Sequence, residues 1–484
     1  MNTNNPKPHL VPKGILFPFI LLTSLFFLWA IPNNLTDTML ATFKRIMSLD
    51  DRTTAFIQVV TYFLGYGCFA IPGALFIKKY TYKSGVMLGL LLVVTGALLF
   101  FPAMHTIHMG KVICFSAYLL ALFILFAGLS VLETSTNSYV FAIGDERTAT
   151  RRLNLAQSFN PFGALMGAII SQVFVLSQLN TMTEAQRGAL SADALIDVQL
   201  PELRAVTMTY VVLGLIILAV LVMIFFTKMP NLKEDDKTID FKGTWRRLKG
   251  NKRYVWSVVA QFLYVGAQVA VWSYTIRYVI DQLNLDAVVS NLGAQPAGEQ
   301  VIATLRSVEP VAASFYNMVE SAGLDMFLPR TAEQAAATYY MLSLMLFVVA
   351  RFLCTWLMKY IKPVYLLIVL SALASLLTVT VIYDNGFTGI YALMGISFCM
   401  SLMFPTIYGL GVQGLGEDTK LGGSGMVMAI AGAAVLTQLQ GLLSDHVGSI
   451  KFAFWVPAVA FICILGYSVF ISKNRRVKHN TAEL

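Results

Sequence analysis

Residues 14–30 read GILFPFILLTSLFFLWA and contain no charged side chain. The run continues into the more polar stretch IPNNLTDTML at 31–40. An apolar run of about 18 residues or more is long enough to cross the roughly 30 Å hydrocarbon core of a membrane. Comparable runs recur along the whole chain, so the sequence predicts a protein that crosses a membrane many times.

The bulk composition supports a membrane protein. Hydrophobic residues make up 57% of the 484 residues and charged residues only 13%, whereas soluble proteins are about 45–50% apolar and about 25% charged. The net charge of +9 is concentrated in a few short loops, as is typical of topology signals, and it does not indicate a nucleic-acid partner. The five cysteines show no disulfide or metal-site spacing, so we expect small core residues.

Twelve apolar spans are predicted, six on each side of a polar segment. The predicted division is an N-terminal six-helix half at 1–227, a central loop at 228–252, a C-terminal six-helix half at 253–472 and a tail at 473–484. The C-terminal half contains a long loop at 282–334. Two halves of six spans are typical of secondary transporters, in which the substrate site lies near the middle of the membrane between the halves.

The charge of the loops predicts the orientation in the membrane. Residues 228–253 contain nine Lys and Arg against four acidic residues, whereas residues 281–333 contain two Arg against seven acidic residues. Loops rich in Lys and Arg stay in the cytoplasm. We therefore expect both termini and the central loop to be cytoplasmic.

Charged side chains inside the spans are the first candidates for function, because burying a charge in a membrane is costly. They are Asp37 on the first span, Glu133 on the fourth, Arg277 on the seventh and Arg351 on the eighth. We expect a structural or gating role for the two arginines. No histidine falls within a predicted span, so a histidine proton relay is not expected.

Asp37 and Glu133 are the predicted proton carriers. Burial raises the pKa of a carboxyl group towards the physiological range, so its protonation can change with exposure to either side of the membrane. The predicted depths differ, with Asp37 towards the outer side and Glu133 towards the cytoplasmic side. The hypothesis is that the proton is carried in two steps, with Asp37 as the outer and Glu133 as the inner proton site. The alternative is that each carboxylate pairs with a neighbouring helix or lies near an interface.

Polar side chains line up with these carboxylates at helical spacing. Asn33 lies four positions before Asp37 and Asn34 lies three positions before it. Both spacings place side chains on one helix face. By the same spacing, Asn137 lies on the same face of the fourth span as Glu133. Gln157 and Asn160 share a face of the fifth span. On the seventh span a stripe follows i, i+3, i+7 and i+11: Gln261, Tyr264, Gln268 and Trp272.

Amides supply both donors and acceptors, which suits the hydroxyl groups of a ligand, and aromatic faces suit the C–H patches of a sugar ring. No phosphate-binding loop or arginine cluster is present. The stripes therefore favour a neutral polyhydroxylated solute. The alternative is that the amides join membrane helices to one another and that Trp272 is an interfacial anchor.

Several motifs resemble those of the fucose permeases and glucose/galactose permeases of the major facilitator superfamily. They are SLFFLWAIPNNLTD (24–37), LETSTN (132–137), RLNLAQSFNPFGA (152–164), AQFLYVGAQVAVWSYTIRY (260–278) and FPTIYGLGVQGLGEDTK (404–420). The resemblance implies an all-α membrane protein with twelve transmembrane helices in two six-helix halves, the major facilitator fold. It also implies proton coupling and sugar recognition at Asp37 and Glu133, with sugar-binding amides at Asn34, Gln157 and Asn160.

The chain departs from this family pattern at a few positions. Ser138 stands where the family often has a proline after the span 4 motif, so we expect a smaller kink there. Phe404 replaces a tyrosine near the implied site. The loop at 282–334 is longer than in the family, and its segment VIATLRSVEPVAASFYNMVESAG predicts one or two short amphipathic helices.

The sequence thus favours an importer of a neutral monosaccharide by proton symport, with L-fucose as the first candidate and no cofactor or metal. The expected setting is the bacterial inner membrane, with a sugar and the lipid bilayer as partners and a monomer as the working unit. Sodium coupling with a hexose or N-acetylhexosamine is the nearest alternative. The others are a proton antiporter for amphipathic drugs and a sugar sensor that does not transport; an enzyme is not expected.

Overall fold

The computed structural model describes residues 10–11, 14–49, 53, 56–175, 178–180, 187–230, 241–284, 310–324 and 332–480. The regular elements in these ranges are all helical. Twelve of the described helical segments are long and apolar enough to cross a membrane, which confirms the predicted number of spans. They are Leu16–Thr36, Phe56–Lys79, Tyr82–Met109, Lys111–Ala142, Glu146–Val175, Ala192–Phe226, Lys252–Leu283, Ala335–Leu357, Pro363–Tyr383, Phe387–Val412, Gly416–Val447 and Ile450–Lys473.

The first six spans and the central segment contain α1 (Leu16–Met47), α3 (Phe56–Gln58), η1 (Val59–Gly67), α4 (Cys68–Lys79), α5 (Tyr82–His105), η2 (Thr106–Met109), α6 (Lys111–Ala142), α7 (Glu146–Gln157), α8 (Asn160–Ile170), η3 (Ser171–Val175), α10 (Ala192–Phe226) and α11 (Phe241–Gly250). The rest of the chain contains α12 (Lys252–Leu283), α15 (Pro310–Ser321), α16 (Ala332–Leu357), α17 (Pro363–Tyr383), α18 (Phe387–Met400), α19 (Met403–Val412), η6 (Gly416–Asp418), α20 (Thr419–Met428), η7 (Ala429–Ala431), α21 (Gly432–Val447), α22 (Ile450–Ala453) and α23 (Trp455–Asn480).

The chain forms two compact units. The first unit contains Met1–Phe262 and Pro405–Ala434, and the second contains Leu263–Phe404 and Val435–Leu484. Within the first unit α20 packs against α4 and α6, so a segment from late in the sequence belongs to the N-terminal bundle. The boundaries predicted at 227 and 253 remain a prediction.

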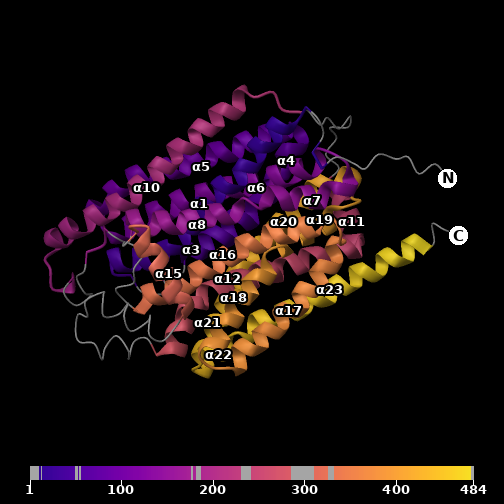
Figure 1. The fold of residues 1–484 in the computed structure, drawn as a ribbon. Helices are drawn as coiled ribbons and strands as arrows, with labels where there is room; N and C mark the ends of the chain where they lie inside the picture. The colour runs from indigo at the N-terminus through magenta and orange to yellow at the C-terminus, as the bar shows by residue number, and fades with distance from the viewer. Residues whose placement is uncertain are drawn as a thin grey trace. The chain divides into compact units, whose positions relative to one another are not determined.

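Close helix contacts in the first unit depend on glycine. In this unit α5 packs against both α6 and α10 (Figure 1). A Cβ atom at Gly128 would lie 2.6 Å from the backbone nitrogen of Val93, and one at Gly89 would lie 2.6 Å from that of Leu132. Small residues let the backbones of membrane helices approach closely and gain packing contacts. This packing fixes the position of α6, which carries Glu133.

The fifth and tenth spans each contain a break of two residues between successive helices. The fifth span ends one helix at Gln157 and begins the next at Asn160, immediately before Pro161; proline lacks the N–H group that would continue the hydrogen-bond pattern. The tenth span breaks between Met400 and Met403. By contrast, α6 runs unbroken for 32 residues through Ser138; the smaller kink expected there stays a prediction.

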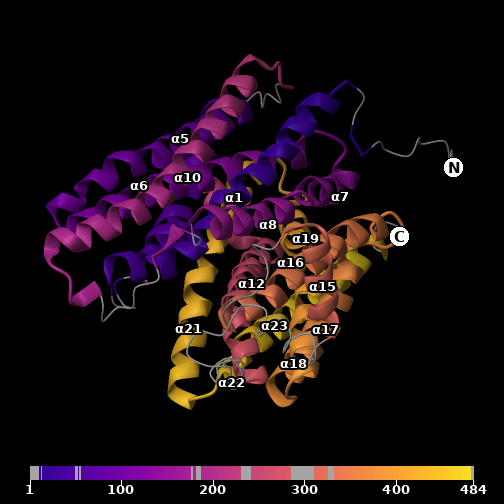
Figure 2. The same cartoon turned by 60° about the vertical axis from the view of Figure 1, so that its left-hand side comes forward.

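In the second unit, α17 packs against α18 and α23 (Figure 2). One short helix, α15, lies within the loop predicted at 282–334. The side chain of Tyr316 on α15 is fully buried, and its hydroxyl lies 3.1 Å from the hydroxyl of Thr338 on α16. This part of the loop therefore packs against the bundle.

A buried carboxyl and its polar neighbours

Glu133 is a buried carboxyl in the middle part of α6, with a side-chain environment supplied by three segments of the first unit. It is 7% exposed. Tyr66 on the π-helical segment η1 and Asn137 on the next turn of α6 interact with the carboxyl group through their side chains. Among the ion pairs of the described residues, none involves Glu133. A buried carboxylate without a cation is costly, so this position suits a group that binds and releases a proton.

The amides of Asn137 and Gln157 form a buried pair beside this carboxyl. Gln157 Nε2 donates to Asn137 Oδ1 over 2.8 Å, and the two side chains are 5% and 0% exposed, respectively. The hydrogen bond connects α6 to the last turn of α7. Because both residues were predicted from separate spans, their contact is a tertiary feature that the sequence spacing did not contain.

Tyr408 on α19 is a member of this cluster that the sequence analysis missed. Its hydroxyl lies 3.1 Å from that of Ser138, which is adjacent to Asn137 on α6. Tyr408 is fully buried and lies close enough to Glu133 to interact with it electrostatically. The motif that contains Tyr408 was recognised, but nothing in its local pattern assigned the tyrosine a role.

The fifth span places its three amides in different environments. Asn154 donates to the carbonyl of Thr150 over 2.9 Å and to the hydroxyl of Thr406 over 3.4 Å. Asn160, after the helix break, donates to the carbonyl oxygen of Phe26 on α1 over 3.3 Å. The three-residue spacing of Asn154, Gln157 and Asn160 therefore does not bring them to a common partner.

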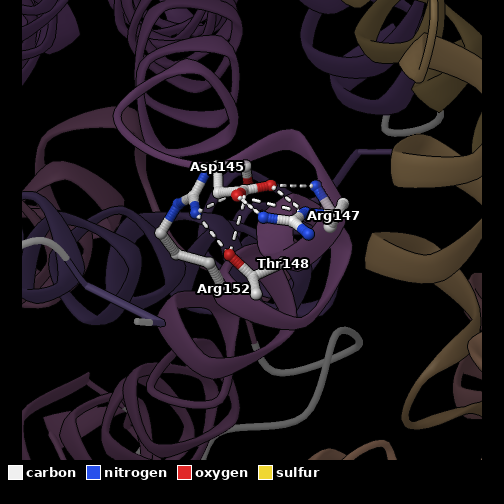
Figure 3. Close-up of polar contacts among 4 residues, drawn as sticks. All are labelled: Asp145, Arg147, Thr148 and Arg152. Carbon is white, nitrogen blue, oxygen red and sulfur yellow. Dashed lines mark hydrogen bonds and ion pairs between the residues drawn. The ribbon is translucent and has the colours of Figure 1, made fainter. Parts of the chain in front are cut away.

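A polar turn connects α6 to α7. Asp145 caps the start of α7, where it accepts a hydrogen bond from the backbone N–H of Arg147 over 2.8 Å (Figure 3). Side-chain hydrogen bonds from Arg147 lower the pKa of the Asp145 carboxyl to about 2. The carboxyl group is therefore ionised at any physiological pH.

Arg152 closes the same turn from inside the protein (Figure 3). Its side chain is fully buried, and it donates to the carbonyl oxygens of Val140 over 2.8 Å and Phe141 over 2.6 Å. These carbonyls belong to the last turn of α6, where a cation is favourable. The sequence pattern assigned no role to Arg152, because its burial is set by the tertiary fold.

The first span carries Asn33 and Asn34 on α1. Asn34 donates to the carbonyl of Ala30 over 3.0 Å. The Oδ1 atom of Asn33 is buried and has no hydrogen-bond partner among the described residues. Asp37 lies in α1, but its side chain lies outside the described part of the chain, so its predicted pairing with the two asparagines stays a prediction.

The predicted stripe on α12 divides into buried and half-buried positions. Gln261 is fully buried, and neither atom of its amide finds a partner in the part of the chain that the structure describes. Gln268 is half-buried. Tyr264 donates its hydroxyl to the carbonyl of Met400 over 3.0 Å, which satisfies the backbone where the tenth span breaks. A role for Tyr264 in sugar binding stays a prediction.

An aromatic and cationic cluster surrounds Trp272 in the second unit. The indole N–H of Trp272 donates to the hydroxyl of Ser397 over 3.2 Å, and its ring lies edge-on to Phe347. The guanidinium of Arg351 lies 5.0 Å from the centre of the Phe347 ring, a cation–π distance. Arg351 is 3% exposed.

The two remaining predicted residues differ in environment. Phe404 packs with its ring 6.4 Å from that of Tyr264. Arg277 is exposed and lies over the ring of Tyr274, 5.7 Å from its centre. The structural or gating roles of Arg277 and Arg351 stay predictions.

Twelve apolar spans with a buried carboxyl on the fourth are typical of a polytopic membrane protein of the secondary-transporter class. The sequence profile of the Major Facilitator Superfamily matches residues 19–420, and the chain belongs to this superfamily. It is similar to the L-fucose-proton symporter of Haemophilus influenzae, with 34% identity over 94% of this chain and 96% of the relative. The L-fucose-proton symporter of Escherichia coli is 33% identical over 96% of this chain and 94% of the relative.

A solved structure agrees with these sequence relatives. The crystal structure of the transporter FucP in the outward conformation matches 95% of this chain and 99% of its own chain, with a TM-score of 0.77 and 33% identity. The resemblance stated from the motifs is thereby confirmed for the superfamily and for the fold.

Proposed function

We propose that this protein carries a neutral monosaccharide into the cell together with a proton, with L-fucose as the first candidate substrate. The observation that carries the proposal is the buried Glu133 carboxyl beside the hydrogen-bonded amides of Asn137 and Gln157. Similarity to two L-fucose-proton symporters over nearly the whole chain supports both the sugar and the coupling ion.

The proton site in this proposal is Glu133, acting with Asp37. An ionised carboxylate is unfavourable in a membrane interior unless polar groups or water stabilise it. A change in the surroundings of Glu133 during alternating access therefore changes its tendency to hold a proton. Because the Tyr66 and Asn137 side chains interact with the carboxyl, sugar binding at the neighbouring amides changes the same hydrogen-bond network and couples the two ligands.

The sugar site combines amides and aromatic rings. Amide groups donate hydrogen bonds to hydroxyls and accept hydrogen bonds from them. A buried amide without partners has already lost its hydrogen bonds to water on folding, so a hydrogen bond to a ligand contributes more binding free energy there. Within the part of the chain that the structure describes, the Gln261 amide and the Oδ1 atom of Asn33 are in this situation. Trp272, Tyr264 and Phe404 supply apolar faces for the ring C–H groups.

The proposed setting follows the charge of the loops. The protein lies in a bacterial inner membrane with both termini in the cytoplasm, and it works as a monomer. Other hexoses and N-acetylhexosamines are the competing substrates, and sodium is the competing coupling ion.

The test uses purified full-length protein in sodium-free liposomes. External pH is recorded after addition of L-fucose, D-galactose, D-glucose or N-acetylglucosamine in turn. Alkalinisation on addition of L-fucose is the expected result, since a symporter removes external protons with the sugar. No pH change with any sugar, combined with sugar uptake that requires sodium, would refute proton coupling.

Variants of the carboxyl separate proton coupling from sugar binding. Glu133→Gln should abolish uphill accumulation while it retains exchange of labelled for unlabelled sugar, because exchange requires no net proton movement. Asp193→Asn is the matched control, since Asp193 is an exposed carboxylate on α10. Accumulation that is unchanged in both Glu133→Gln and Asp37→Asn would rule out these carboxyls as the proton carriers.

A further inference from the structure

A groove of about 490 Å³ runs along the first unit between α10, the α8–η3 segment and α1. These segments pack against one another in this unit (Figure 2). The volume lies within the range of about 300–1,000 Å³ that is typical of small-molecule sites. None of the described side chains placed in the sugar or proton site lines this groove.

The groove is apolar along most of its length. Ile31 and Leu213 are buried and form its floor, whereas Phe174, Val212 and Ile216 line it and remain 59%, 56% and 49% exposed. All of them lie within predicted membrane spans. Apolar side chains exposed at this depth face hydrocarbon rather than water, so the groove is shaped for an apolar chain.

The part of the groove on the apolar side of Arg204 matches one leaflet of a bilayer. The lining residues on α10 extend from Pro201 to Ile216, and the stretch from Arg204 to Ile216 is about 18 Å long at 1.5 Å per residue. Half of a hydrocarbon core is about 15 Å. From Arg204 to the end of α10 at Phe226 the helix is about 33 Å long, so Arg204 lies at one membrane surface.

The end of the groove at this surface is cationic. Arg204 lines the groove and is exposed. It forms no hydrogen bond or ion pair with any other described residue. A guanidinium group binds phosphate oxygens through paired N–H donors. The groove therefore presents an anion-binding end at headgroup depth and an apolar trough at acyl-chain depth.

We propose that this groove binds one anionic phospholipid, with an acyl chain in the trough and the phosphate on Arg204. In the proposed topology the lipid belongs to the outer leaflet. The site lies beside the helices that carry Asn33 and Asn160, so its occupant supports the packing of α1, α8 and α10. The sugar and proton groups take no part in binding it.

The experiment titrates detergent-solubilised full-length protein with phosphatidylglycerol and counts retained lipids by native mass spectrometry. One lipid per chain is expected to bind more tightly than the rest. Arg204→Gln should weaken this first binding event about fivefold, which corresponds to about 1 kcal/mol per basic residue at an anionic lipid surface. Ala205→Phe should also weaken it, because Ala205 lines the trough and the added ring fills it.

Matched controls identify the source of the signal. Lys111→Gln removes an exposed cation at the start of α6, away from the groove, and should leave the first binding event unchanged. Phosphatidylcholine has acyl chains but no net negative charge, and glycerol phosphate has a negative charge but no acyl chain. Both should bind more weakly than phosphatidylglycerol. Sugar uptake by Arg204→Gln and Ala205→Phe verifies that they are folded. Equal lipid binding by wild type and either folded variant, or equal binding of phosphatidylcholine, would overturn the proposal.

Discussion

Replacement of Glu202 by Gln should destabilise the protein by about 3–5 kcal/mol, the cost of removing one partner from a buried ion pair. Arg187 and Glu202 are each 1% exposed. Two guanidinium nitrogens of Arg187 donate to the two carboxylate oxygens over 2.9 and 2.5 Å. The backbone N–H of Asn180 donates to the same carboxylate over 2.7 Å. A glutamine at 202 leaves the Arg187 charge buried without its counter-ion.

The free energy of unfolding is measured by denaturant titration of the purified protein in detergent. A loss of 3–5 kcal/mol raises the unfolding equilibrium constant by about 10² to 10⁴. The double variant Arg187→Met with Glu202→Leu should recover most of the loss, because an apolar pair of similar volume carries no buried charge.

Asp193→Asn is the control on the same helix, and its exposed side chain predicts a change within about 0.5 kcal/mol. The reasoning is refuted if Glu202→Gln is as stable as the wild type, or if the double variant is less stable than Glu202→Gln alone.

Three further predictions concern the first unit. Gly163→Val should prevent α8 from packing on α1, because the added Cβ would collide with the Phe27 carbonyl oxygen. The yield of monodisperse protein is expected to fall. Gly466→Ala should leave the yield unchanged, because a Cβ at Gly466 would point into open space. Arg152→Lys should cost about 1–3 kcal/mol of unfolding free energy, because an ammonium cannot reproduce the forked donors to the end of α6; equal stability in denaturant titrations would contradict this role. The Asp145 carboxylate has a lowered pKa of about 2, so its stabilising effect is full above about pH 4 and is lost as pH falls towards 2. The stability difference between wild type and Asp145→Asn should therefore be constant from pH 8 to 5 and shrink below pH 4, and a difference that changes between pH 8 and 5 would be inconsistent with it.

The number of spans was predictable from the sequence because each span must satisfy its own backbone and present an apolar surface to lipid. That requirement acts on each run of about 20 residues separately, and GILFPFILLTSLFFLWA at 14–30 already meets it. The candidate carboxyl Glu133 was predictable for the same reason, since a charge within such a run is rare.

The interruptions of the spans were only partly predictable. The break before Pro161 follows from the chemistry of proline, and the motif that contains it was recognised. The break after Met400 is followed by Pro405 in the first turn of α19, and the Tyr264 hydroxyl from another span donates to the Met400 carbonyl at the break. The sequence around Met400 does not show that a hydroxyl on another helix donates to the carbonyl left free by the break.

The sequence by itself determined the class of protein, the twelve helices and a set of membrane-buried polar residues, because these follow from the cost of polar groups in hydrocarbon. Only the tertiary structure decided which of them meet. The Asn137–Gln157 pair joins residues on different helices, and the Ser138–Tyr408 contact joins positions 270 residues apart. The burial of Arg152 at the end of α6 is likewise tertiary. Helical periodicity fixes the face on which a side chain lies, whereas its partner depends on which helices pack against that face.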